Sequence, residues 1–306
     1  MSKTITRPKP DKKRLRRTMM FMNAQKPGLI KDAYIYGVDS IMLDLEDAVA
    51  ENQKDAARFS LYHALKTIDY GDTEVIVRIN GLDTPHWQED IRVCVAGGAD
   101  GIRIAKCESA KDVKIVEEHI LAAEKEFGVE EGRTLIMAAL ESPKGVLNAY
   151  EICSASDRLF GVALSGGDFH RSMHTKYVKS GIELNTARSL IVLAARAAGV
   201  QCFDTVFTNL DDEEGFEAEV RLNHEMGFDG KSLINPRQIA YVHKAFAPTE
   251  KEIATAETYV RTYEEQSKLG VGVYTVNGKM VDIAFIKDAS RVIALAKACG
   301  VYHGDL

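Results

Sequence analysis

The chain has 306 residues, of which 45% are hydrophobic and 27% are charged, a balance that excludes disordered, collagen-like and coiled-coil proteins. Its 45 acidic residues outnumber its 39 lysines and arginines, so nucleic acid is not expected as a partner. The five cysteines are odd in number and form no CxxC pair, which argues against both a disulfide framework and a zinc site.

Targeting and membrane signals are weak. No apolar run approaches the roughly 18 to 20 residues that a membrane span needs, and the polar N-terminus lacks the apolar segment of a signal peptide. We therefore expect a cytoplasmic protein with reduced thiols and no membrane attachment. The one dense group of basic residues, at 12–17, is either a solvated tail or a local anion site.

Eight short apolar runs alternate with longer segments of helical periodicity, the pattern of βαβ units and a parallel sheet. Eight such repeats within about 245 residues favour a single (β/α)8 TIM barrel over two doubly wound halves. Between the second and third runs, the residues Ala56, Phe59, Leu61 and Leu65 recur at helical spacing and predict an apolar stripe that packs on the sheet. The predicted strands are 18–22, 40–45, 74–79, 101–105, 134–140, 159–164, 202–206 and 231–234.

The pattern changes after Pro236. A helix is followed by a helix start at Pro248-Thr-Glu, a second long helix to about residue 269, a hairpin over 270–282 with Asn277-Gly278 at its turn, and a last helix that ends near Gly300. The sequence thus predicts two domains, a catalytic barrel over 1–247 and a C-terminal helical and hairpin extension over 248–306.

Polar residues follow five consecutive predicted strands, where a (β/α)8 barrel carries its reactive groups. A single charge after a strand is explained by exposure of the loop to solvent, but five at one rim indicate a site. Arg78 can hold a substrate carboxylate, form a salt bridge with Glu46, or do both. The groups are Asp44, Glu46 and Asp47 at the end of the second strand, Arg78 and Asn80 at the end of the third, Lys106 at the end of the fourth, Glu141 at the end of the fifth and Asp168 just after the sixth.

Carboxylates that meet at the mouth of a closed barrel need a balancing cation. Glu141 and Asp168 follow adjacent strands and offer only oxygen ligands, which suits Mg²⁺ better than zinc. A metal that holds a 2-oxo acid polarises its carbonyl and stabilises an enolate. The rim therefore indicates metal-dependent aldol or Claisen chemistry.

Six longer strings, spread in order over almost the whole chain, resemble the HpcH/HpaI aldolase/citrate lyase family, which includes citrate lyase β subunits and citryl-CoA lyases. The resemblance implies a Mg²⁺-dependent lyase that splits a citryl thioester into oxaloacetate and an acetyl thioester. The strings are RRTMMF from Arg16, SIMLDLEDAV from Ser40, VRINGLD from Val77, AALESPKGVLNA from Ala138, FDGKSLINPRQI from Phe228 and NGKMVD from Asn277.

The same resemblance assigns roles to residues. Glu141 and Asp168 would bind Mg²⁺, and Arg78 would hold the carboxylate of the oxo acid. Glu46 and Asp47 would orient Arg78 and metal-bound water.

Beyond the rim, the resemblance makes Asp282 an acid/base that reaches into a neighbouring subunit's site, which requires a homo-oligomer, a trimer or a hexamer. Arg16 and Arg17, together with the loop at Asn235 and Pro236, would face the phosphopantetheine arm and phosphates of the thioester carrier. That carrier would be an acyl carrier protein or coenzyme A. An acyl carrier subunit and a citrate lyase α subunit are the expected partners.

The sequence also departs from the family pattern. Met22-Asn23-Ala24 stands where members usually have V-P-G, and Ser165-Gly166-Gly167-Asp168-Phe169 stands where they usually have G-A-E-D-Y. The aspartate remains, but the acidic residue before it is lost. A stand-alone lyase for citramalyl-CoA or malyl-CoA is therefore the alternative interpretation, and a subunit that binds a carrier without catalysis is a third.

Overall fold

The computed structural model describes residues 5, 7–268, 273–276 and 278–306. The chain divides after Val242 into two compact units, and each is described by itself. The division falls within the helix α10 (Ile239–Phe246).

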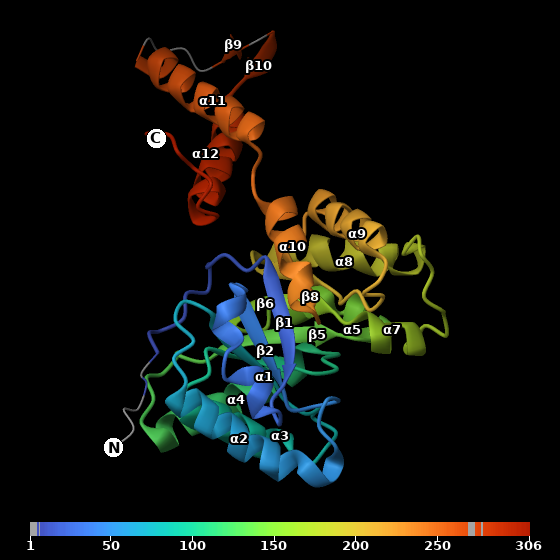
Figure 1. The fold of residues 1–306 in the computed structure, drawn as a ribbon. Coiled ribbons are helices and arrows are strands. Elements are labelled where there is room, and N and C mark those ends of the chain that lie inside the picture. Colours follow the sequence, from blue (N-terminus) through green and yellow to red (C-terminus); the bar gives the residue numbers. More distant parts are fainter. Residues whose placement is uncertain (1–4, 6, 269–272, 277) are drawn as a thin grey trace. The chain divides into compact units, whose positions relative to one another are not determined.

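Eight parallel strands close into a barrel in the first unit (Figure 1). The first strand pairs with the second on one side and with the eighth on the other, which completes the ring. The prediction of a (β/α)8 barrel is confirmed. The strands are β1 (Thr18–Asn23), β2 (Ser40–Asp44), β3 (Glu74–Arg78), β4 (Gly101–Ile104), β5 (Leu135–Leu140), β6 (Leu159–Leu164), β7 (Gln201–Asp204) and β8 (Gly230–Leu233).

Helices connect successive strands, as parallel pairing requires. The longest of them in this unit, α4, begins with a capping box in which Ser109 and Asp112 satisfy each other's backbone N–H groups. The α-helices are α1 (Pro27–Ile30), α2 (Lys54–Thr67), α3 (Trp87–Gly97), α4 (Ala110–Phe127), α5 (Pro143–Leu147), α6 (Ala149–Cys153), α7 (Gly166–Ser172), α8 (Ile182–Ala198), α9 (Glu213–Met226) and α10. Short 3₁₀ helices lie at Ala33–Tyr36, Glu51–Gln53 and Pro236–Gln238.

The interior of the barrel is filled by buried apolar side chains from six of the strands, which can meet only inside the ring. The phenyl rings of Phe160 and Phe203 meet there edge to face, with centroids 6.3 Å apart. The members of this cluster are Met19, Met42, Ile76, Leu135, Met137, Phe160, Ala163 and Phe203, with Phe21 packed against them. Strands buried on both faces read as continuous apolar runs, which is why they were visible in the sequence.

A buried ion pair closes the amino-terminal end of the barrel. Two nitrogens of Arg16 donate to the two carboxylate oxygens of Glu74 at 2.7 Å, and a third donates to Gln201 at 2.6 Å. Arg16 and Glu74 are both fully buried, and Arg17 pairs with Asp39.

The expectation that Arg16 and Arg17 face a thioester carrier is therefore wrong for Arg16. Its guanidinium is consumed by internal partners and has no exposed surface. Both arginines precede β1, which places them at the end of the strands opposite to the rim where reactive groups collect. Arg16 therefore serves the fold at this point, through its bonds to Glu74 and Gln201.

One predicted helix face also needs correction. Helix α2 buries Ala57, Leu61 and Leu65, together with Ala64, whereas Ala56 is exposed and Phe59 is 70% exposed. The ring of Phe59 instead lies on His63, one turn further along the helix, with centroids 4.3 Å apart.

The second unit contains α11 (Glu250–Lys268), a two-stranded antiparallel hairpin of β9 (Tyr274–Val276) and β10 (Lys279–Val281), and α12 (Ile283–Ala298). The two helices pack through Ala256, Ala289 and Ile293. The order of helix, hairpin and helix is the one that the sequence pattern after Pro248 predicts. Asn277 and residues 270–272 of the predicted hairpin lie outside the described residues. Within the described part of the chain, no helix is both long and apolar enough to span a membrane.

Candidate active site

Acidic and basic side chains alternate where β2 and β3 end. Arg78 donates two hydrogen bonds to Asp44, at 2.7 Å from Nε and 2.6 Å from Nη2, and its Nη1 lies 2.8 Å from Glu46. Burial disfavours the charge of Arg78, but Asp44 and Glu46 outweigh this effect and raise its pKa. The salt bridge with Glu46 is thus present, although Asp44 is the stronger partner.

Glu46 links this pair to the next strand. Its other oxygen accepts a hydrogen bond from the ammonium of Lys106 at 2.8 Å. Lys106 follows β4 and holds a positive φ of 50°, a conformation that costs a non-glycine residue about 1 to 2 kcal/mol. The ion pair with Glu46 holds the Lys106 ammonium at the rim.

Glu141 differs from its neighbours because it has no hydrogen-bond partner among the described residues. It follows β5 directly, only 3% of its surface is exposed, and both carboxylate oxygens are buried and unsatisfied. Burial raises the pKa of Glu141 to about 7; the nearby cations Arg103 and Arg78 oppose the shift, and Glu46 and Asp168 add to it. A buried carboxylate in this condition is costly unless another positive group joins it.

Asp168 comes from the adjacent strand and lies in the first turn of α7. It pairs with Arg171 on the next turn. Gly166 lets this turn approach β7, because its N–H donates to the Thr205 hydroxyl at 2.7 Å and a Cβ at this position would lie 2.9 Å from the same oxygen. The close packing sets the position of Asp168 relative to Glu141.

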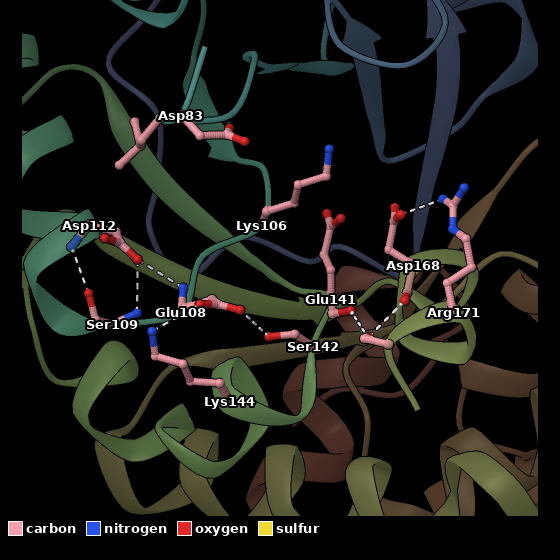
Figure 2. Close-up of a pocket in the computed structure, with 12 residues that line it drawn as sticks. Asp83, Lys106, Glu108, Ser109, Asp112, Glu141, Ser142, Lys144, Asp168 and Arg171 are labelled. Atoms are coloured by element: carbon pink, nitrogen blue, oxygen red, sulfur yellow. Dashed lines mark hydrogen bonds and ion pairs between the residues drawn. The ribbon is translucent and has the colours of Figure 1, made fainter. Parts of the chain in front are cut away.

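Glu141 and Asp168 extend into one cavity of about 690 Å³, which Lys106 and Arg171 also line (Figure 2). A second cavity of about 440 Å³ shares Asp168 and Arg171 with the first and is also lined by Arg78, Asp47 and Arg103, among others. The structure thus places Glu46, Arg78, Glu141 and Asp168 at one rim, as their positions after consecutive strands predict, with the exposed Asp47 at its edge.

The donor set fits a hard divalent cation. Within the described part of the chain, no group of three or more histidines, cysteines, aspartates and glutamates is arranged to hold a metal, and the pair that shares a cavity is Glu141 and Asp168. Mg²⁺ commonly binds through one or two carboxylates and fills its remaining positions with water and substrate oxygens. The two unsatisfied oxygens of Glu141 supply the negative charge that such an ion requires.

Arg103 is a rim residue that the sequence analysis missed. It lies within β4, 1% exposed, and is the register neighbour of Arg78 on β3. Its Nη2 donates to the Ser165 hydroxyl at 2.7 Å, while Nε and Nη1 have no partner. Burial lowers the pKa of Arg103, and the charge of Arg78 lowers it further, to about 10.

Asn235 and Pro236 line neither of these cavities. Asn235 and Pro236 follow β8, where the Asn235 side chain accepts a hydrogen bond from the Arg237 backbone at 2.9 Å and caps a 3₁₀ helix. Asn235 lines a separate cleft of about 20 Å³. Asp282 belongs to the second unit and caps the N-terminus of α12 through the backbone N–H groups of Ala284 and Phe285.

The fold and the rim are those of a class of protein, the (β/α)8-barrel enzymes, which carry their reactive groups at the carboxyl ends of the strands. Comparison with known proteins agrees with this class. Residues 17–236 match the family described as HpcH/HpaI aldolase/citrate lyase. Residues 172–301 match a family of carbon–carbon bond lyases of the TIM-barrel fold.

Individual relatives cover three quarters of the chain or more. The citrate lyase subunit beta of Leuconostoc mesenteroides subsp. cremoris is 54% identical over 285 residues, 93% of this chain and 94% of the relative. A crystal structure of CitE from Mycobacterium tuberculosis, in complex with magnesium, acetoacetate and coenzyme A, has a TM-score of 0.73 and 29% identity, covering 92% of this chain and 98% of that one. A citrate lyase beta subunit from the same organism, complexed with oxaloacetate and magnesium, has a TM-score of 0.63 and 30% identity, covering 76% and 98%.

The chain therefore belongs to the HpcH/HpaI aldolase/citrate lyase family. The family resemblance of the sequence strings is confirmed.

Proposed function

We propose that this protein is a Mg²⁺-dependent carbon–carbon lyase that cleaves a citryl thioester into oxaloacetate and an acetyl thioester. The observation that carries the proposal is the buried carboxylate of Glu141, which has no protein partner and lies beside Asp168 in a cavity lined with cations. The 54% identical citrate lyase subunit beta and the magnesium-containing structures of relatives support this choice of metal and substrate.

In this proposal, Glu141 and Asp168 hold the cation, which supplies Lewis-acid polarisation of the oxo-acid carbonyl when bound. Arg78 retains N–H groups at its Nη1 and Nη2 edge that are not used by Asp44 or Glu46, and these take a substrate carboxylate. Asp44 and Glu46 fix the plane of that guanidinium. When the hydroxyl proton of the citryl group is removed, the bond between the hydroxyl-bearing carbon and the thioester methylene breaks. The methylene carbon then takes up a proton and becomes the methyl group of the acetyl thioester.

A coupled assay of the full chain with Mg²⁺ tests this function. Citryl-CoA should release oxaloacetate, and a chelator should abolish the release. Release of pyruvate from citramalyl-CoA or of glyoxylate from malyl-CoA, in preference to oxaloacetate, would replace the proposed substrate while keeping the chemistry. The proposal would be contradicted if the chain had no activity on any of these esters and none on a citryl acyl carrier protein.

Asp168→Asn is the sharpest variant for the metal assignment, because it removes the charge with little change of shape. We expect it to lose at least a hundredfold in Mg²⁺-dependent turnover with an unchanged unfolding midpoint. Glu130→Gln, which breaks an exposed ion pair with Lys9 and lines neither cavity, is the matched control and should keep full activity. Undiminished turnover by Asp168→Asn would refute its role as a ligand.

We also propose that Asp282 completes the site of a neighbouring subunit as the group that handles the acetyl carbon. Asp282 lies in the unit that follows the barrel, next to the hairpin that carries the family string. Mixed oligomers of Asp282→Ala and Arg78→Ala protomers should regain part of the activity that each lacks alone, because some sites then combine two intact halves. No recovery in verified mixed oligomers would contradict the shared site.

The carrier and the partners follow from the same proposal. A citryl group on an acyl carrier protein would require the acyl carrier and α subunits of a citrate lyase complex, whereas a coenzyme A ester would not. We propose that the isolated chain is a homo-oligomer, a trimer or a hexamer. Comparing its turnover of citryl acyl carrier protein with its turnover of citryl-CoA distinguishes the two carriers. The loop at Asn235 and Pro236 is tested in the same experiment. If this loop contacts the carrier, Asn235→Ala should raise KM for the carrier-bound substrate.

A further inference from the structure

Among the described residues that line the two cavities, Arg103 is the buried cation whose charge no protein carboxylate meets through a hydrogen bond. Its Nη2 donates to the neutral hydroxyl of Ser165, and its Nε and Nη1 atoms are buried without a hydrogen bond. Leaving charged N–H groups unsatisfied in a site excluded from water is unfavourable. The arrangement therefore calls for an anion that the chain itself does not provide.

The carboxylates around Arg103 are already engaged. Asp44 receives the fork of Arg78, and Glu46 lies between Arg78 and Lys106. Glu141 acts on Arg103 through space and shares no hydrogen bond with it. If Glu141 and Asp168 hold the cation, neither is left to neutralise Arg103.

Arg103 lines the smaller cavity. Its Cζ atom lies 5.1 Å from the centroid of the Phe21 ring, and the Cζ atom of Arg78 lies 5.2 Å from the same centroid. Both guanidiniums thus lie near the same ring, at the same level of adjacent strands, and both arginines line the cavity of about 440 Å³. Two fixed cations in one cavity suit a small molecule with two carboxylates.

We infer that Arg103 binds the second carboxylate of a four-carbon oxo diacid and so selects it over a monocarboxylic oxo acid. The inference rests on the proposed function, in which the carboxylate next to the reacting carbonyl lies with the cation and Arg78. Oxaloacetate carries a further carboxylate on the neighbouring methylene, whereas pyruvate has only hydrogen there and glyoxylate lacks that carbon. Arg103 is thus a specificity-determining residue, and Ser165 orients it.

The test compares the binding of freshly prepared oxaloacetate and pyruvate to the full chain in the presence of Mg²⁺, by titration calorimetry. The wild-type chain should prefer oxaloacetate. Arg103→Met should weaken oxaloacetate binding at least tenfold and change pyruvate binding less than threefold, because only oxaloacetate has the group that Arg103 contacts. Arg103→Lys, which keeps the charge but not the fork, should restore part of the preference.

The outcomes separate the inference from the function on which it rests. If the wild-type chain bound neither acid, the proposed function would fail. If it preferred oxaloacetate and Arg103→Met kept the same preference, or if a folded Arg103→Met lost both acids equally, the selective role of Arg103 would be overturned and the lyase proposal would stand.

Folding of the variants is followed by thermal unfolding. Arg158→Met, which removes an arginine bound to Glu124 and away from both cavities, serves as the control for the loss of a largely buried arginine. If Arg103→Met does not fold, Arg103→Lys carries the test alone: a preference equal to that of the wild type would then overturn the inference.

Discussion

Two buried acidic groups of the barrel, Glu141 after β5 and Asp204 at the end of β7, are treated in opposite ways. Asp204 is fully buried, and both of its oxygens accept hydrogen bonds, from the Arg188 fork at 2.9 Å and from Lys231 at 3.0 Å. Glu219 pairs with the same two cations, so two positive and two negative groups balance. Glu141 has no such partner.

The pKa values express the difference. Burial alone would raise the pKa of Asp204, but the charges of Lys231 and Arg188 outweigh it and lower the pKa to about 2. At Glu141 the burial effect wins and raises the pKa to about 7. A paired buried carboxylate stabilises one arrangement of the chain, while an unpaired one keeps a charge available for a ligand. The comparison thus separates a structural network from a site within the same barrel.

The largest effect should come from breaking the paired network. Asp204→Asn keeps the shape but leaves Arg188 and Lys231 short of one negative charge, so the free energy of unfolding should fall by about 3 to 5 kcal/mol. Urea unfolding followed by the fluorescence of Trp87, the single tryptophan and a residue of α3 in the barrel, measures this change. Glu130→Gln, at an exposed pair, should change stability by less than about 0.5 kcal/mol. An equally small loss for Asp204→Asn would refute the structural reading of the network.

Glu141→Gln should have the opposite sign and a smaller size. Because the folded chain holds the Glu141 charge against a pKa of about 7 instead of 4.5, the variant should be more stable than the wild type by up to about 3 kcal/mol at pH 8 in the presence of a chelator. It should also lose Mg²⁺-dependent turnover. A variant that was less stable than the wild type under these conditions would show that Glu141 supports the fold.

The barrel could be predicted because its strands are buried on both faces and therefore appear as unbroken apolar runs. Their observed ends differ from the predicted ones by at most two residues, as at β7 (Gln201–Asp204 against 202–206). The α2 face was predicted less well. Ala56 and Ala57 both fit a helical period, and the sequence does not show that Phe59 turns toward His63 and solvent.

The rim carboxylates and Arg78 were predictable because topology alone brings residues that follow parallel strands to one end of a barrel. Arg103 was overlooked because it lies inside its strand, between Ile102 and Ile104, and only residues after the strands were considered. An arginine within an apolar run buried on both faces was nonetheless a signal, since such residues are seldom buried without a partner. The same topology could have excluded Arg16, which precedes its strand.

The smallest effect, about 1.4 kcal/mol per pH unit, concerns how the two acids respond to pH. For Glu141 the folded pKa is raised, so the metal-free wild type is not penalised below pH 4.5 and loses stability as the pH rises from 4.5 to about 7. The advantage of Glu141→Gln should grow over that range and level off above it. For Asp204 the folded pKa is lowered, so its contribution is present above about pH 4 and disappears as the pH falls toward 2.

Unfolding curves of the wild type and the two variants, collected with chelator at half-unit steps between pH 3 and pH 8.5, measure these opposite windows. If the gain of Glu141→Gln stayed constant from pH 5 to pH 8, the raised pKa would be wrong, and Glu141 would be an ordinary ionised carboxylate in the folded chain. The other outcome is that the stability gain of Glu141→Gln follows the expected slope while the stability loss of Asp204→Asn stays level over the same pH range. The two acids would then differ in their charged partners and not in how deeply they are buried. The charge at Glu141 would then be one that the fold tolerates at a cost, which a bound cation removes.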